Sequence, residues 1–117
     1  MYLEVVQETS DTIVIAFKPE SLDALKTKIA DQFKKDGYVR IAEISGVITY
    51  ERGSLVGRIF LGAFYKYFKW DVRFIEEAER TVVTINKQAS GMWGGLIGVA
   101  QVKTELQRIK GVMMNWK

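Results

Sequence analysis

A stretch in which basic and aromatic residues alternate is the part of the sequence most suited to binding. Seven of the fourteen aromatic residues of the chain fall within residues 60–74. Residues 52–74 contain five basic residues and one acidic residue, a net charge of +4 on a chain whose total is +3. We call residues 55–73 the aromatic-basic stretch. The residues in it that we predict to contact a ligand or partner are Arg58, Phe60, Phe64, Tyr65, Lys66, Tyr67, Lys69, Trp70 and Arg73.

Basic residues interleaved with aromatic residues suit three different roles. At a membrane surface the rings lie at headgroup level, and each nearby Lys or Arg adds about 1 kcal/mol of attraction to anionic lipid. On single-stranded nucleic acid each stacked ring contributes about 1–3 kcal/mol while the cations follow the phosphates. Alternatively, every second aromatic fills the core and the cations form the solvated face, which the period of two over residues 68–74 favours. Residues 55–67 carry too many rings for one face, so we expect a partner chain, a ligand or lipid to cover part of them.

A glycine-rich segment lies before the C-terminal end of the chain. Its spacing matches neither the dinucleotide-binding fingerprint nor the P-loop, so it is a poor signal for phosphate binding. Within a helix, Gly91, Gly94, Gly95 and Gly98 form a smooth strip that lets another backbone approach closely, and we favour this close-packing role. Trp93 beside the strip is a further candidate for lining a pocket or anchoring an interface.

The chain contains no histidine and no cysteine, which excludes most catalytic triads, thiol nucleophiles, disulfides and transition-metal sites. Glu43 shares the nominal inward face of its strand with Val39 and Ile41, where a carboxylate has a raised pKa and could act as an acid or base. A β-bulge or a frayed strand end would turn it outward instead. No other group of carboxylates, serines or lysines suggests a reaction, so we expect a non-catalytic protein without cofactor or metal.

Several elements must position these residues, and the first half of the chain predicts five of them. Two apolar runs joined by a polar turn indicate a β-hairpin. A stripe of apolar residues at steps of three and four, followed by Gly37, predicts a helix over about 19–36. Two further runs of period two flank Ser45-Gly46, which predicts a second hairpin with a two-residue turn. The four predicted strands span residues 2–7, 13–17, 38–44 and 47–52.

The second half of the chain begins with a segment that the pattern leaves open. Residues 55–67 fit either a short amphipathic helix or a bent strand. Residues 68–76 alternate as a half-buried strand, and residues 80–87 return as its hairpin partner. A long helix over about 91–115 follows, with an apolar stripe through Leu106, Ile109 and Met113 and a mostly polar side that includes Glu105 and Arg108.

These elements predict one α+β domain over residues 1–117. We expect a curved antiparallel sheet of about six strands, an early helix, and a long C-terminal helix packed across the sheet. The sequence starts without the pattern of a signal peptide, and its longest uncharged stretch has fifteen residues, short of the about 20 that a transmembrane helix needs. A cytoplasmic location is therefore expected.

The function predicted from these features is a small non-catalytic binding or interaction domain. It would use the aromatic-basic stretch and Trp93 to hold an apolar or anionic ligand or a second subunit, and a homodimer is the simplest assembly. Peripheral association with a membrane surface is one alternative. Binding of single-stranded nucleic acid is another, which the total charge of +3 does little to favour.

Overall fold

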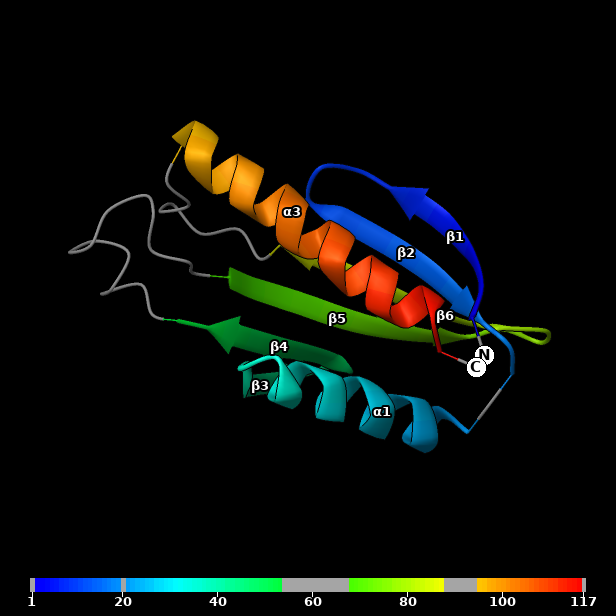
Figure 1. Cartoon of the computed structure of the whole chain (residues 1–117). Helices are drawn as coiled ribbons and strands as arrows, with labels where there is room; N and C mark the ends of the chain where they lie inside the picture. Colours follow the sequence, from blue (N-terminus) through cyan, green and yellow to red (C-terminus); the bar gives the residue numbers. More distant parts are fainter. Residues whose placement is uncertain (1, 20, 54–67, 88–94, 117) are drawn as a thin grey trace.

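A computed structural model describes residues 2–19, 21–53, 68–87 and 95–116 of the chain, with the side chains of the last range described from residue 100 onward (Figure 1). In order, its elements are β1 (Tyr2–Glu8), β2 (Thr12–Phe17), α1 (Leu22–Lys35), β3 (Val39–Ile44), β4 (Val47–Arg52), β5 (Phe68–Glu76), β6 (Thr81–Lys87) and α3 (Gly95–Met114).

The six strands form one open sheet in the order β1-β2-β6-β5-β4-β3. Every neighbouring pair is antiparallel. Helix α1 carries the chain from β2 to β3, the edge strand at the opposite side of the sheet, and the later strands then fill the space back to β2. The predicted α+β fold with an antiparallel sheet and two helices is confirmed.

Both helices lie on the same face of the sheet (Figure 1). Helix α1 lies along the β3–β4 side and α3 lies over the β2–β6 side, so the core forms between the two helices and the strands. The predicted stripes point into this core, where Trp70 and Phe17 are the largest fully buried side chains. The buried residues that the helices contribute are Leu25, Ile29 and Phe33 from α1, and Val102, Leu106, Ile109 and Met113 from α3.

Helix α1 begins three residues later than the sequence pattern predicts, because its N-cap is Ser21 and Pro19 is not part of its first turn. The hydroxyl of Ser21 accepts a hydrogen bond from the backbone N–H of Ala24 at 3.3 Å, which satisfies one of the free donors of the first turn. Pro19 lies before this cap. At the other end Gly37 has a φ of +91°, the left-handed conformation that the sequence predicted for this stop.

The hairpin of β3 and β4 turns through Ser45 and Gly46, whose φ angles of 53° and 80° are both positive, as a tight two-residue turn requires. The register of this hairpin shifts between Arg40 and Ala42, which is a β-bulge. Glu43 is exposed and pairs with Arg40 across 3.3 Å. The inward orientation considered for Glu43 is therefore wrong, because the strand has a bulge and the side chain is exposed.

The C-terminal helix is described from Gly95, and residues 91–94 of its predicted span lie outside the described residues. Its 20 residues extend for about 30 Å at 1.5 Å per residue. Neither helix in the described ranges has both the length and the apolar character that crossing a bilayer requires.

Candidate functional site

A groove opens at the surface between α1 and the β3 edge of the sheet. Its volume of about 430 Å³ lies within the range of about 300–1,000 Å³ that is typical of small-molecule sites. It is lined by Ala30, Asp31 and Lys34 of α1, by Tyr38, Val39 and Arg40 of the chain that enters and forms β3, and by Tyr50 of β4.

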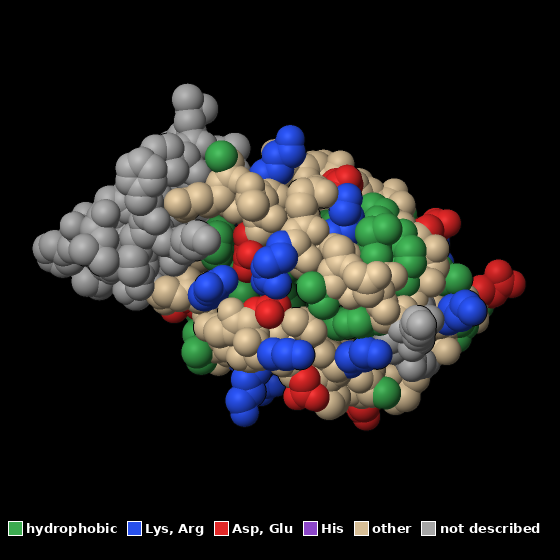
Figure 2. All heavy atoms as spheres, in the orientation of Figure 1, with side chains coloured by type: hydrophobic (Ala, Val, Ile, Leu, Met, Phe, Trp, Pro, Cys, Tyr) green, Lys and Arg blue, Asp and Glu red, His purple; other side chains and the backbone are tan. Residues whose placement is uncertain are grey.

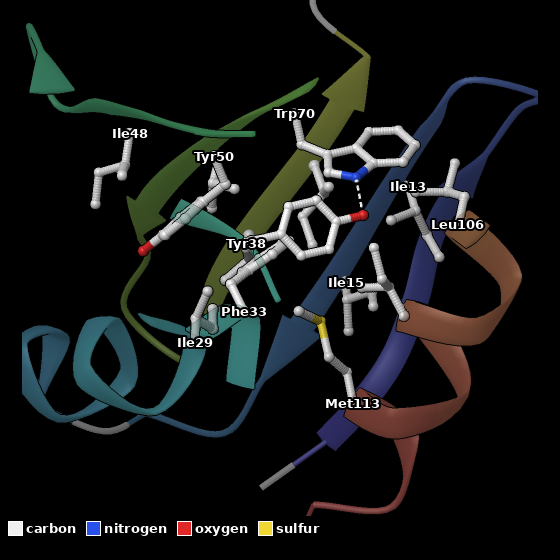
Figure 3. Close-up of a cluster of buried hydrophobic side chains, with 14 of the residues drawn as sticks. Ile13, Ile15, Ile29, Phe33, Tyr38, Ile48, Tyr50, Trp70, Leu106 and Met113 are labelled. Carbon is white, nitrogen blue, oxygen red and sulfur yellow. Dashed lines mark hydrogen bonds between the residues drawn. The ribbon is translucent and has the colours of Figure 1, made fainter. Parts of the chain in front are cut away.

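The aromatic floor of the groove is held in place by ring packing (Figure 3). Phe33 of α1 stacks on Tyr50 with ring centroids 4.4 Å apart and an interplanar angle of 6°. The same ring meets Tyr38 edge to face at 5.0 Å and 88°. One turn before Phe33, helix α1 carries the small side chain of Ala30, which leaves the space open instead of filling it. The site is thus preformed by the packing of α1 on β4.

Tyr50 brings an unused hydrogen-bonding group to the groove. The residue is 3% exposed, yet no hydrogen bond to its hydroxyl is found in the part of the chain that the structure describes. Burial raises the pKa of this phenol above its ordinary value, with opposing electrostatic effects from Arg40 and Glu43. Buried tyrosine hydroxyls usually have a partner, so this one is available to a bound molecule.

Charged side chains line the groove from both walls. Lys34 comes from α1 and Arg40 from β3, while Asp31 is the single acidic residue in the described lining. Arg40 pairs with Glu43, but this ion pair is largely exposed and contributes little. Lys34 and Asp31 form no ion pair within the described ranges. The groove therefore combines an apolar floor with a charged lining.

Tyr38 separates the groove from a buried polar network. Its ring lines the groove, and its hydroxyl accepts a hydrogen bond from Trp70 Nε1 at 2.8 Å (Figure 3). The same hydroxyl donates to Glu105 Oε2 of α3 at 2.6 Å. Burial, and then the adjacent Glu105 carboxylate, raise the pKa of Tyr38 well above its usual range.

Glu105 is the centre of this network, and its side chain is 7% exposed. Arg108 donates two hydrogen bonds to the carboxylate, from Nε to Oε1 at 2.7 Å and from Nη2 to Oε2 at 2.9 Å. Arg52 of β4 adds a cation at 3.7 Å, and Arg108 also reaches Asp36 at 3.1 Å. The hydrogen bonds that Arg108 donates to Glu105, more than any other effect, raise the pKa of Arg108. Because every one of these charges is paired, the network joins α3 to α1 and the sheet and is not itself a binding site.

The sequence pattern placed Glu105 on the mostly polar side of its helix, and that prediction is wrong. Glu105 follows the buried Val102 by three residues and precedes the buried Ile109 by four, so it shares their face. This spacing in the sequence could have indicated that Glu105 is buried. Its partner Tyr38 lies 67 residues away in the chain, and no local pattern connects the two.

Most residues of the aromatic-basic stretch lie outside the described residues, and so do three candidates of the glycine-rich segment. Gly95 begins α3 and Gly98 lies within its first turn. The predicted contact residues of which nothing is described are Arg58, Phe60, Phe64, Tyr65, Lys66, Tyr67, Gly91, Trp93 and Gly94.

The described part of the aromatic-basic stretch is strand β5, which divides its side chains between two faces. Trp70 is fully buried in the core and stacks with Phe68 at 6.1 Å, so its indole is not part of the surface. Lys69 and Arg73 lie on the opposite face of the sheet from the helices, where Arg73 donates to Asn86 at 2.7 Å. For residues 68–74, alternation between core and solvated face is therefore the explanation of the pattern.

Outside the groove, the surface formed by the described residues gives no further site of a recognisable type. On the face that carries both helices, basic and acidic side chains are interspersed (Figure 2). Among the described residues no group of three or more carboxylates could hold a metal ion. No known protein family has a model that matches the chain, and no curated protein matches it either.

Proposed function

We propose that this protein is a non-catalytic binding domain that holds a small ligand in the groove between α1 and β3–β4. The observation that carries the proposal is Tyr50, a buried residue that lines the groove and whose hydroxyl has no hydrogen-bond partner in the described part of the chain. A bound molecule would supply that partner and would lie against rings already fixed by Phe33.

The chemistry of the chain supports binding over catalysis. It has no histidine and no cysteine. Glu105 is the single buried carboxylate among the described residues, and it already accepts hydrogen bonds from Tyr38 and Arg108. Its hydrogen bonds are therefore committed within the fold, and it is not among the residues that line the groove.

The other partners predicted from the sequence stay predictions. Association with a membrane surface or with single-stranded nucleic acid rests mainly on residues 55–67, which lie outside the described residues. A homodimer and a cytoplasmic location likewise stay predictions.

Filling the groove tests the proposal. Ala30 lines the groove, whereas Ala24 is exposed on the same helix. We expect Ala30→Leu to weaken binding of the neutral fluorescent probe N-phenyl-1-naphthylamine at least about tenfold, because the larger side chain occupies the space, and tenfold corresponds to about 1.4 kcal/mol. Ala24→Leu is the matched control and should bind like the parent. Unchanged probe binding by a folded Ala30→Leu variant would contradict the proposal.

A further inference from the structure

We infer that the groove takes an amphipathic organic monoanion, with an apolar ring system as its body and one anionic group as its head. This inference rests on the proposed function and adds the chemical class of the ligand. It is argued from the hydroxyl of Tyr50, from the two cations of the lining, and from the apolar floor.

The hydroxyl of Tyr50 selects the head group. A phenol can donate or accept a hydrogen bond, and its surroundings decide which role is favoured. Two cations, Lys34 and Arg40, line the same groove, so an acceptor that carries negative charge gains from them as well as from the hydroxyl. A hydrogen bond to an ionised acceptor is roughly twice as strong as one between neutral groups.

Both cations can be recruited to such a head group. Lys34 has no ion pair among the described residues. Arg40 has one, with Glu43, but both side chains are more than a third exposed, so little is lost when the guanidinium turns to a ligand. Asp31 leaves the described lining with one net positive charge, which fits one anionic group and disfavours a second.

The body of the ligand is selected by the floor. The rings of Tyr38 and Tyr50 and the side chains of Val39 and Ala30 line the groove. Val39 is 64% exposed, a large share for an aliphatic side chain beside a groove, and a bound apolar body would cover it. Planar rings suit this surface because they can pack on the tyrosines.

Two probes that share a skeleton test the inference. The anion 8-anilino-1-naphthalenesulfonate differs from the neutral N-phenyl-1-naphthylamine by a sulfonate, so the comparison isolates the head group. We expect the parent protein to bind the anion at least about tenfold more tightly at low salt. Tyr50→Phe should weaken binding of the anion about tenfold and change the affinity for the neutral probe less than about twofold, because only the anion forms a hydrogen bond with the hydroxyl.

A lysine pair provides a second test that does not touch the aromatic floor. Lys34→Gln should weaken binding of the anionic probe about threefold or more. The matched control is Lys35→Gln, because Lys35 is also exposed in the last turn of α1 but does not line the groove. Control and parent should bind alike.

The outcomes separate the two proposals. Equal affinity for the two probes, both lost in Ala30→Leu, would keep the groove as a binding site and overturn the monoanion class. Equal weakening of both probes by Tyr50→Phe, or equal effects of Lys34→Gln and Lys35→Gln, would also overturn it. Binding of neither probe, or binding of both that ignores Ala30→Leu, would contradict the proposed function itself.

Discussion

Tyr38 and Tyr50 are both almost fully buried, and yet their hydroxyls are in opposite situations. The hydroxyl of Tyr38 lies between Trp70 and Glu105, whereas that of Tyr50 has no partner in the described chain. The two hydroxyls point in opposite directions (Figure 3). The hydroxyl of Tyr38 therefore stabilises the fold, whereas we assign that of Tyr50 to the proposed binding site.

This contrast predicts different costs for the same substitution. Tyr38→Phe removes a donor and an acceptor from buried partners, so we expect it to lower the free energy of unfolding by about 1–3 kcal/mol. Tyr50→Phe is the matched control and should leave the stability unchanged or slightly raised, because no hydrogen bond is lost. Urea denaturation measures both. Equal losses for the two variants would show that the hydroxyl of Tyr38 does not hold the network.

Tyr38 also predicts how stability changes in alkali. Its pKa is raised in the folded protein, whereas tyrosine in the unfolded chain ionises near pH 10. The folded state therefore holds the proton more tightly, and this stabilising contribution is complete below about pH 10 and is lost progressively as the pH rises above it. We expect the stability of Tyr38→Phe to fall less steeply than that of the parent between about pH 10 and 11. Parallel curves would contradict the assignment.

At the scale of elements, α3 is held to the rest of the fold by a charge as well as by its apolar stripe. Glu105 connects it to β4 through Arg52 and to the chain before β3 through Tyr38. Removing the charge of this carboxylate weakens the hydrogen bonds that Tyr38 and Arg108 donate to it, while the guanidinium groups of Arg52 and Arg108, each on a side chain 39% exposed, stay partly solvated.

Glu105→Gln should accordingly lower the free energy of unfolding by about 1–2 kcal/mol, although the side chain keeps its size. Glu79→Gln is a suitable control, because Glu79 is exposed in the turn between β5 and β6. Thermal or urea unfolding of both variants checks the difference. A loss no larger than that of the control would mean that the charge of Glu105 contributes nothing.

The elements could be predicted from the sequence where one periodicity decided them. The stripe through Leu25, Ile29 and Phe33 predicted α1, and the alternation after Phe68 predicted β5. The start of α1 was wrong because Ser21, and not Pro19, satisfies the first free N–H group. Local patterns could not place the bulge after Arg40, which depends on how β3 pairs with β4.

The groove could not be predicted for a similar reason. Its lining combines one face of α1, the chain that enters β3, and Tyr50 of β4, and no spacing in the sequence relates these three segments. The strongest local signal in the sequence is instead the density of aromatic residues in the aromatic-basic stretch. For Trp70 that density reflects the core.

At the scale of the whole molecule, both helices cover one face of an open sheet, and the groove lies where α1 meets an edge strand. Bulges interrupt the pairing of β1 with β2 and of β3 with β4, so both edges are irregular. Bulged edges disfavour pairing with the sheet of another molecule. If the predicted homodimer forms, we expect its interface away from both edges.

The most direct test is a fluorescence titration of the anionic probe 8-anilino-1-naphthalenesulfonate against Ala30→Leu and Ala24→Leu side by side. If the groove between α1 and β3–β4 is the binding site, the first variant binds the probe at least about tenfold more weakly than the second while both unfold at the same temperature. Equal affinity of the two folded variants would contradict the assignment of this groove as the binding site.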